Sequence, residues 1–184
     1  ERRPGSVGTP LPGVEVRLED DNGVAINSEG EVGQLLIKGP QVFQGYLNLA
    51  DKTKESFKNG WFATGDVVML EKGYYKILGR DSVDIIKSGG YKISALEIED
   101  VLLRNPEIKE CAVVGIPDDK WGEIVAAAVV IKEEIIQSEE IQAWCSSYLS
   151  DYKIPRRVIV MKNLPKNSMG KITKPKLKEV LEDN

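Results

Sequence analysis

The sequence contains no histidine and only two cysteines, and these absences exclude several kinds of site. Without histidine, the chain cannot supply a Ser-His-Asp or Cys-His nucleophile system, a histidine general base or a histidine-ligated zinc. Cys111 and Cys145 are too far apart for a Cys-x-x-Cys motif, and apolar residues flank both. We therefore expect two buried thiols in a reducing compartment rather than a disulfide.

Long hydrophobic runs and a strong net charge are also absent. No apolar run approaches the roughly 20 residues of a membrane-spanning helix, so we expect no transmembrane segment. The formal net charge is −4, which gives no reason to expect a nucleic-acid partner. The 184 residues are 41% hydrophobic and 29% charged, which is typical of a globular protein with one domain or two small ones.

The charges that are present are unevenly distributed. Between Lys153 and Lys178 every charged residue is basic. A cationic segment suits an anionic small ligand, and a solvated face is the alternative explanation.

At the other end, residues 1–6 include neither an initiator methionine nor the apolar stretch of a signal peptide, so we expect the N-terminus to be cut from a longer protein.

The first part of the chain has the pattern of a small β structure. Clusters of Gly, Pro, Asn and Asp mark turns, and short, partly alternating segments lie between them at residues 14–18, 33–37, 67–70 and 74–78. Such segments predict strands of a small antiparallel sheet or barrel without a long helix. We therefore expect a β-barrel-like subdomain over residues 1–79.

The rest of the chain predicts a compact α+β domain over residues 80–184, with the junction near residues 80–82. A hairpin is expected around Gly89 and Gly90, and Ser94 with Glu97 forms a capping box that begins a helix ending before Pro106. In that helix Leu96, Ile98, Val101 and Leu102 are available for burial. Strands are expected at 111–116, 124–131 and 158–161, and helices from Ser138 to about residue 149 and from near Thr173.

Two motifs near the domain junction carry groups that suit a nucleotide. Asp66, in Thr64-Gly65-Asp66, is an acceptor for two hydrogen bonds from a ribose diol, or it only stabilises a turn. Arg80 ends a predicted strand and either bridges a ribose or phosphate oxygen or pairs with a neighbouring carboxylate.

Two further motifs present lysines beside glycines. Gly89 and Gly90 would let a ligand chain pass close to the backbone, and the flanking Lys87 and Lys92 would attract phosphate. A hairpin turn explains the glycines equally well but not the lysines. Lys171 follows a glycine on a polar loop at residues 165–171, where it is either an attachment point on a carrier or a cation for a developing negative charge.

Together these motifs resemble the C-terminal third of the acyl-adenylate-forming (AMP-binding) superfamily, which includes acyl-CoA synthetases, luciferase-like enzymes and peptide-synthetase adenylation domains. Residues 30–46 resemble its glycine-rich barrel motif, 60–66 its ribose-binding motif, 79–99 its hinge and thiolation motif, and 165–171 its catalytic-lysine motif. Residues 82–99 are most similar to malonyl-CoA synthetases and their methylmalonate-using relatives.

The resemblance implies roles for individual residues. Asp66 would bind the ribose hydroxyls of ATP, Arg80 would reach ribose or phosphate, and Lys171 would act in adenylation. Asp81 or Ser82 would be the hinge of a mobile C-terminal domain. Both remain candidates because the hinge segment here is one residue longer than the usual family pattern.

The same resemblance implies a path for the thiol substrate. Lys87, Gly89 and Gly90 would border a pantetheine tunnel, with Trp121 at its mouth. The implied activity is an ATP-dependent acid:CoA ligase for a small-molecule carboxylic acid such as malonate or methylmalonate.

ATP, Mg²⁺ and CoA would take part, with the magnesium ligands and the acyl pocket in an upstream remainder, so the chain alone is expected to be inactive. The alternatives are an adenylation domain that loads a carrier protein and a non-enzymatic interaction or lysine-carrier module. The expected compartment is the cytoplasm or the mitochondrial matrix.

Overall fold

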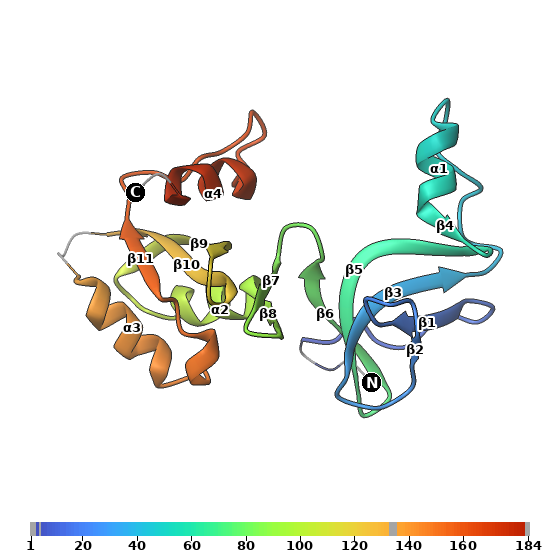
Figure 1. Ribbon diagram of the computed structural model, residues 1–184, viewed down its shortest axis with the longest axis horizontal. Coiled ribbons are helices and arrows are strands. Elements are labelled where there is room, and N and C mark those ends of the chain that lie inside the picture. The colour runs from blue at the N-terminus through green and yellow to red at the C-terminus, as the bar shows by residue number, and fades with distance from the viewer. Residues whose placement is uncertain (1–2, 4, 133–135, 183–184) are drawn as a thin grey trace. The chain divides into compact units, whose positions relative to one another are not determined.

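The computed structural model describes residues 3, 5–132 and 136–182 of the chain (Figure 1). The chain forms two compact units, Glu1–Ser82 and Val83–Asn184. The expectation about the N-terminus depends partly on residues 1, 2 and 4, which lie outside the described residues. None of the helices in the described part is long and apolar enough to cross a membrane.

The first unit is an antiparallel sheet of six strands in the order β2-β1-β3-β5-β4, with β6 paired to β5. Figure 1 shows β5 bending strongly along its length, so that the sheet curls. This confirms the expected β-barrel-like subdomain. The elements are β1 (Glu15–Glu19), β2 (Ala25–Ile26), β3 (Val32–Lys38), α1 (Ala50–Ser56), β4 (Phe57–Lys58), β5 (Trp61–Glu71) and β6 (Tyr74–Arg80).

The short helix α1 was not predicted from the sequence. It has seven residues and buries none of its side chains, so it lacks the apolar periodicity that marks a helix. Beside it, Phe43 forms edge contacts with Tyr46, Phe57 and Phe62. Phe43 is 40% exposed, so this aromatic cluster is partly open to solvent.

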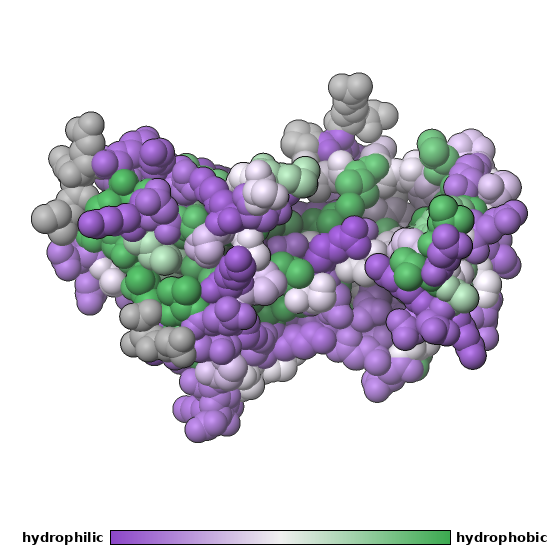
Figure 2. All heavy atoms as spheres, turned by 90° about the horizontal axis from the view of Figure 1, so that it is seen from above, coloured by the Kyte–Doolittle hydropathy of each residue, from purple (hydrophilic) through white to green (hydrophobic). Residues whose placement is uncertain are grey.

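Hydrophilic side chains cover most of the face in Figure 2, and apolar side chains gather there in smaller patches.

The second unit is an α+β structure around a five-stranded sheet, as expected. β9 and β10 pair antiparallel along nearly their whole length, and β11 adds a parallel strand to β10. The β7–β8 hairpin joins the sheet where Ser88 faces Gly122. The elements are β7 (Ile85–Ser88), β8 (Tyr91–Ser94), α2 (Ala95–Leu103), β9 (Ile108–Asp118), β10 (Gly122–Ile131), α3 (Ser138–Ser146), η1 (Asp151–Lys153), β11 (Arg157–Val160) and α4 (Lys174–Glu182).

Both faces of this sheet are covered by helices. On one face, Val113 and Val125 pack with side chains of α2 and α3, among them Ile98 and Ile141. On the other face, the alternate strand residues pack with α4, which contributes Leu177 and Leu181. Figure 1 shows α3 and α4 on opposite sides of β9–β11. Burial on both faces explains why these strands read as continuous apolar runs rather than as alternating ones.

The expected start of α2 is correct, but one of its core residues is not. The Ser94 hydroxyl accepts a hydrogen bond from the Glu97 N–H at 3.2 Å. Ile98, Val101 and Leu102 are buried, whereas Leu96 is 42% exposed. Leu96 lies off the stripe that these three residues form on the helix.

The expected cap of α3 is wrong by one residue. Gln137 is the N-cap, and its N–H donates to the Glu140 carboxylate at 2.8 Å. Ser138 is the first helical residue, and its hydroxyl donates to the Val158 carbonyl instead. The helix ends at Ser146, because the next residues turn more tightly, with N–H groups bonded to carbonyls three residues back.

The two cysteines are free and buried, as expected. Both lie in the core between the sheet and helices α2 and α3.

Candidate functional site

The Thr-Gly-Asp motif forms a bulge in β5. The register of β5 on β3 shifts at residues 64–66, and Gly65 has φ +78°, a conformation that favours glycine. The Thr64 hydroxyl donates to the Leu35 carbonyl and accepts the Asp66 N–H, both at 3.0 Å. The bulge therefore fixes the backbone from which the Asp66 carboxylate projects.

The structure brings Asp66 and Arg80 together across β5 and β6. The two residues are direct partners in the strand register, and Nε of Arg80 lies 3.1 Å from Oδ1 of Asp66. A second guanidinium nitrogen of Arg80 donates to the Thr64 carbonyl at 2.6 Å. The Asp66 side chain is 23% exposed and the Arg80 side chain is 59% exposed, so the pair is accessible from solvent. The ion pair expected as one alternative for Arg80 is therefore present.

The two hinge candidates are attached to the first unit to different degrees. The Asp81 N–H donates to the Gly65 carbonyl at 3.0 Å, and the Gln34 amide donates to the Asp81 carboxylate at 3.4 Å. Ser82 is exposed and is the last residue of the first unit. Asp81 is thus tied to the bulge that carries Asp66.

The glycine pair forms the turn between β7 and β8. Gly89 has φ +56° and Gly90 has φ +84°, as a two-residue hairpin turn requires. The Gly89 N–H donates to the Trp121 carbonyl at 2.9 Å, and a Cβ on Gly89 would lie only 2.9 Å from the indole ring. Around Gly90, by contrast, a Cβ would meet nothing within 4 Å. Gly89 and Trp121, which the sequence placed in one site, are therefore in contact.

Two cations lie over the Trp121 ring. The Arg156 guanidinium carbon is 4.6 Å from the ring centroid, and the Lys120 ammonium is 5.0 Å from it. Lys87 is exposed near the same turn, and its backbone N–H donates to the Glu123 carboxylate at 2.9 Å. Arg156 was not predicted as a site residue, because only the pairing of distant strands brings it to Trp121.

Much of the basic C-terminal segment is neutralised within the second unit. Four of its lysines form ion pairs with carboxylates at 2.7–3.0 Å. The pairs are Lys153–Glu97, Lys166–Glu110, Lys174–Asp84, Lys174–Glu99 and Lys178–Glu123. Each of these four ammonium groups already has a carboxylate partner in this structure.

Lys171 differs from these lysines. It lies on an exposed loop that begins with a β-bridge between Lys166 and Ile172. The Asn167 carboxamide oxygen accepts the Lys171 N–H at 3.0 Å, and the Asn167 N–H donates to the Lys171 carbonyl at 2.8 Å. Within the described residues no carboxylate forms an ion pair with the Lys171 ammonium. The loop therefore presents an uncompensated cation to solvent.

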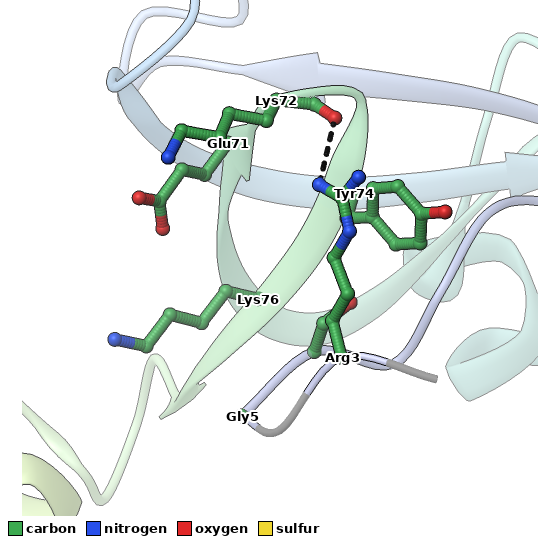
Figure 3. A pocket seen from close by; sticks show the side chains of 7 residues that line it. Arg3, Gly5, Glu71, Lys72, Tyr74 and Lys76 are labelled. Carbon is green, nitrogen blue, oxygen red and sulfur yellow. Dashed lines mark hydrogen bonds between the residues drawn. The ribbon is translucent and has the colours of Figure 1, made fainter. Parts of the chain in front are cut away.

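One pocket of the first unit lies apart from all of these residues. It has a volume of about 500 Å³ and is lined by Arg3, Gly5, Ser6, Glu71, Lys72, Tyr74 and Lys76. Figure 3 shows Arg3 reaching the carbonyl of Lys72, a hydrogen bond of 3.4 Å, beside the ring of Tyr74. None of the expected site residues lines this pocket.

Two family models match the chain in the order expected of one protein family. The AMP-binding enzyme model matches residues 1–47, and the AMP-binding enzyme C-terminal domain model matches residues 97–171. The chain belongs to the AMP-binding enzyme family. This confirms the resemblance found in the sequence.

Curated members of the AMP-binding family resemble the chain over nearly all of its length. The malonate–CoA ligase of Arabidopsis thaliana is 43% identical over 195 residues, which cover 99% of this chain and 31% of that protein. The human mitochondrial malonate–CoA ligase ACSF3 is also 43% identical, over 96% of this chain and 34% of its own. The chain thus spans about a third of the length of the curated relatives it matches.

Solved structures of the family share the fold. ATP-bound MatB from Rhodopseudomonas palustris matches 100% of this chain and 37% of its own, with a TM-score of 0.84 and 37% identity. The o-succinylbenzoate CoA synthetase MenE from Bacillus subtilis, in complex with its acyl-adenylate intermediate, gives the same TM-score and identity over 95% of this chain and 35% of its own.

Proposed function

We propose that this chain is the C-terminal part of an ATP-dependent acid:CoA ligase that activates a small carboxylic acid, malonate or methylmalonate, and is inactive alone. The observation that carries the proposal is Lys171, which has no ion-pair partner among the described residues and lies on an exposed loop between the ion-paired Lys166 and Lys174. The choice of acid rests on the relatives named malonate–CoA ligases, which are 43% identical to this chain.

In the first half-reaction, an oxygen of the carboxylic acid attacks the α-phosphorus of ATP and the bond to pyrophosphate breaks. Negative charge builds on the phosphate oxygens, and a preplaced ammonium stabilises it without giving up a proton. We assign that role to Lys171. Asp66 accepts hydrogen bonds from the ribose hydroxyls, and Arg80 holds Asp66 in place while its remaining N–H groups reach ribose or phosphate.

The magnesium that accompanies ATP is not assigned to this chain. The described residues include no group of three or more His, Cys, Asp or Glu side chains that fits a metal ion.

In the second half-reaction, the CoA thiol attacks the acyl-adenylate carbonyl and AMP leaves. We assign the pantetheine path to the glycine turn, where the space beside Gly90 is open, with Gly89 packed on Trp121 as its wall and Lys87 beside it. The cations over the Trp121 ring suit the phosphates of CoA, since an aromatic ring and a guanidinium together bind a nucleotide. The relatives named as CoA ligases support CoA rather than a carrier protein as the acceptor.

We infer that residues 80–82 join a large N-terminal domain to a mobile C-terminal domain and that Ser82 is the hinge. Asp81 is hydrogen-bonded to the bulge of the first unit, whereas a hinge must change its backbone dihedrals. Proline fixes φ near −65°, so Ser82→Pro should slow CoA-dependent turnover more than pyrophosphate exchange. Asp81→Pro removes the N–H bonded to Gly65 and should slow both. The opposite pattern in assays of the two half-reactions would make Asp81 the hinge.

We place the protein in a reducing compartment, the cytoplasm or the mitochondrial matrix. Two unpaired cysteines agree with reducing conditions, and the human relative is named as mitochondrial.

The proposed function is tested by replacing Lys171 with alanine in the complete ligase. Acid-dependent pyrophosphate exchange should fall by roughly 10²–10³-fold, by analogy with the loss of one preorganised donor at an oxyanion site. Conversion of supplied acyl-adenylate and CoA to thioester should be nearly unchanged, because rotation of the mobile C-terminal domain for that step would carry Lys171 away from the phosphate. Lys176→Ala removes an exposed lysine of α4 and is the matched control. Equal loss of both half-reactions, or of neither, would contradict the assignment.

A further inference from the structure

The loop that carries Lys171 lies between two lysines whose ammonium groups are already engaged. Before the loop, Nζ of Lys166 lies 2.7 Å from Oε2 of Glu110 on β9. After the loop, Lys174 begins α4, and its Nζ lies 2.7 Å from Oδ1 of Asp84 and 2.8 Å from Oε1 of Glu99. Each end of the loop is therefore attached to the body of the second unit by an ion pair.

The attachment at Lys174 is the more buried of the two. The side chain of Lys174 is 11% exposed, and those of Asp84 and Glu99 are each 15% exposed. Glu99 also accepts the Val113 N–H at 2.8 Å, so the backbone of β9 fixes one of the two carboxylates. Charged hydrogen bonds with little water around them are stronger than those on a surface, and breaking one leaves a buried charge behind.

The loop closes its own base with backbone hydrogen bonds. The Thr173 N–H donates to the Pro165 carbonyl at 2.8 Å, and the Asn167 and Gly170 turn lies inside this closure. Such a closed loop has a defined shape, but its backbone bonds do not fix where it stands on the sheet. Three ion pairs help to do so, since their carboxylates come from β9, from α2 and from the segment just before β7. Leu164 and Ile172, on either side of the loop, also pack in the apolar core that contains Leu177 and Leu181 of α4.

We propose that Lys174, with Asp84 and Glu99, and Lys166, with Glu110, are positioning residues that hold the Lys171 ammonium where the reaction needs it. The inference rests on the proposed role of Lys171. Three lysines in nine positions would repel one another, and pairing two of them leaves a single free cation at a fixed place. Misplacing a catalytic group by about 1 Å costs up to ~10²-fold in rate.

The anchoring is tested first without any assay of activity. Hydrogen–deuterium exchange is measured on the 184-residue chain and on its Lys166→Met and Lys174→Met variants. The hydrogen-bonded amides of Asn167, Lys171 and Thr173 should exchange about tenfold faster or more, which is the loss of one charged hydrogen bond. Lys176→Met, which removes an exposed lysine from the same helix, should leave them unchanged. Unchanged exchange in the two anchor variants would overturn the proposal.

A second variant guards against loss of the fold at the buried site. Lys174→Met leaves two carboxylates without their cation, and where it fails to fold, the triple variant with Asp84→Asn and Glu99→Gln removes those charges too. The triple variant should fold and should still show faster exchange of the loop amides. A folded triple variant with native exchange rates would overturn the role of Lys174.

The positioning role is then tested in the complete ligase by comparing the two half-reactions. Pyrophosphate exchange should fall by up to ~10²-fold in the anchor variants, while thioester formation from supplied acyl-adenylate is retained. Lys166→Arg, which keeps the charge, should retain most of the pyrophosphate-exchange activity. Faster loop exchange with unaltered pyrophosphate exchange would overturn the positioning role. If Lys171→Ala itself keeps pyrophosphate exchange, the proposed function fails, and the exchange measurements alone still confirm or overturn the anchoring.

Discussion

The first unit buries few apolar side chains, namely Leu18, Leu36, Val67 and Val68, whereas the second unit covers both faces of its sheet. The two units also hold their proposed site residues differently. Asp66 projects from a bulge fixed by backbone and hydroxyl hydrogen bonds and is paired with Arg80. Lys171 projects from a loop that ion pairs attach to a well-packed body, and it has no such partner within the described residues.

The comparison shows two ways of placing a charged group. Where the core is thin, local backbone geometry and an opposite charge position the side chain. Where the core is thick, the body serves as a rigid support, and the functional cation can be left uncompensated. An uncompensated cation is the one that a developing negative charge can use, because a paired one would first have to leave its partner.

The largest effect is expected at the bulge of the first unit, which carries Asp66. Asp66→Ala in the complete ligase should raise the KM for ATP by roughly 10²-fold or more, since two charge-assisted hydrogen bonds contribute about 1.5–3 kcal/mol each. The affinity for the acid should change little. Glu71→Ala, at the exposed end of β5, is the control. An unchanged KM for ATP, with circular dichroism showing an intact fold, would remove Asp66 from the site.

A smaller effect is expected at the glycine pair, where the two positions form a matched test. Both have positive φ, so alanine at either costs about 1–3 kcal/mol of strain. Only at Gly89 would the added Cβ also press on the Trp121 ring. Gly89→Ala should therefore destabilise the second unit more than Gly90→Ala in denaturant unfolding, and it should slow the CoA-dependent step more. Equal effects would mean that the contact with Trp121 is easily relieved.

The sequence was sufficient to predict the elements that have a local signal. Continuous apolar runs predicted β9 and β10, the Gly89-Gly90 pair predicted the hairpin, and Ser94 predicted the start of α2. The cap at Gln137 was missed because Ser138, a stronger capping residue, stands beside it. Leu96 was misassigned because its neighbours occupy the buried stripe.

Contacts between distant residues were not predictable from one sequence. Lys174 meets Asp84 across 90 positions, and Arg156 reaches Trp121 only because β10 and β11 lie side by side. From the sequence, only the positive charge of the basic segment could be predicted. Only the fold shows that Lys174 is paired with carboxylates and that Lys171 is not. The roles of the site residues and the domain boundary stay predictions.

The smallest expected effect is that the two buried thiols of the second unit are not alkylated. This tests whether the core of the second unit is tightly packed. Burial raises the pKa of the Cys111 thiol from 9.0 to about 12, with the Glu99 carboxylate adding to the shift, and burial raises that of Cys145 to about 11. Alkylation needs a thiolate. Iodoacetamide at pH 8 should therefore label neither thiol in the native chain and both in denaturant, as measured by mass spectrometry.

The same shifts give the second unit a pH dependence whose sign follows from proton linkage. Well below pH 9 nearly all of both thiols is protonated, folded or unfolded, so they contribute little slope. Above pH 9 the unfolded thiols lose protons that the folded ones keep up to about pH 11 and 12, so the free energy of unfolding falls as pH rises. Cys111→Ala with Cys145→Ala should flatten this part of the pH profile in denaturant titrations.

Since the first unit has no cysteine, labelling reports on the second unit alone. Native labelling at the unfolded rate would mean that this core opens readily, and the rigid support assigned to Lys171 would be lost with it.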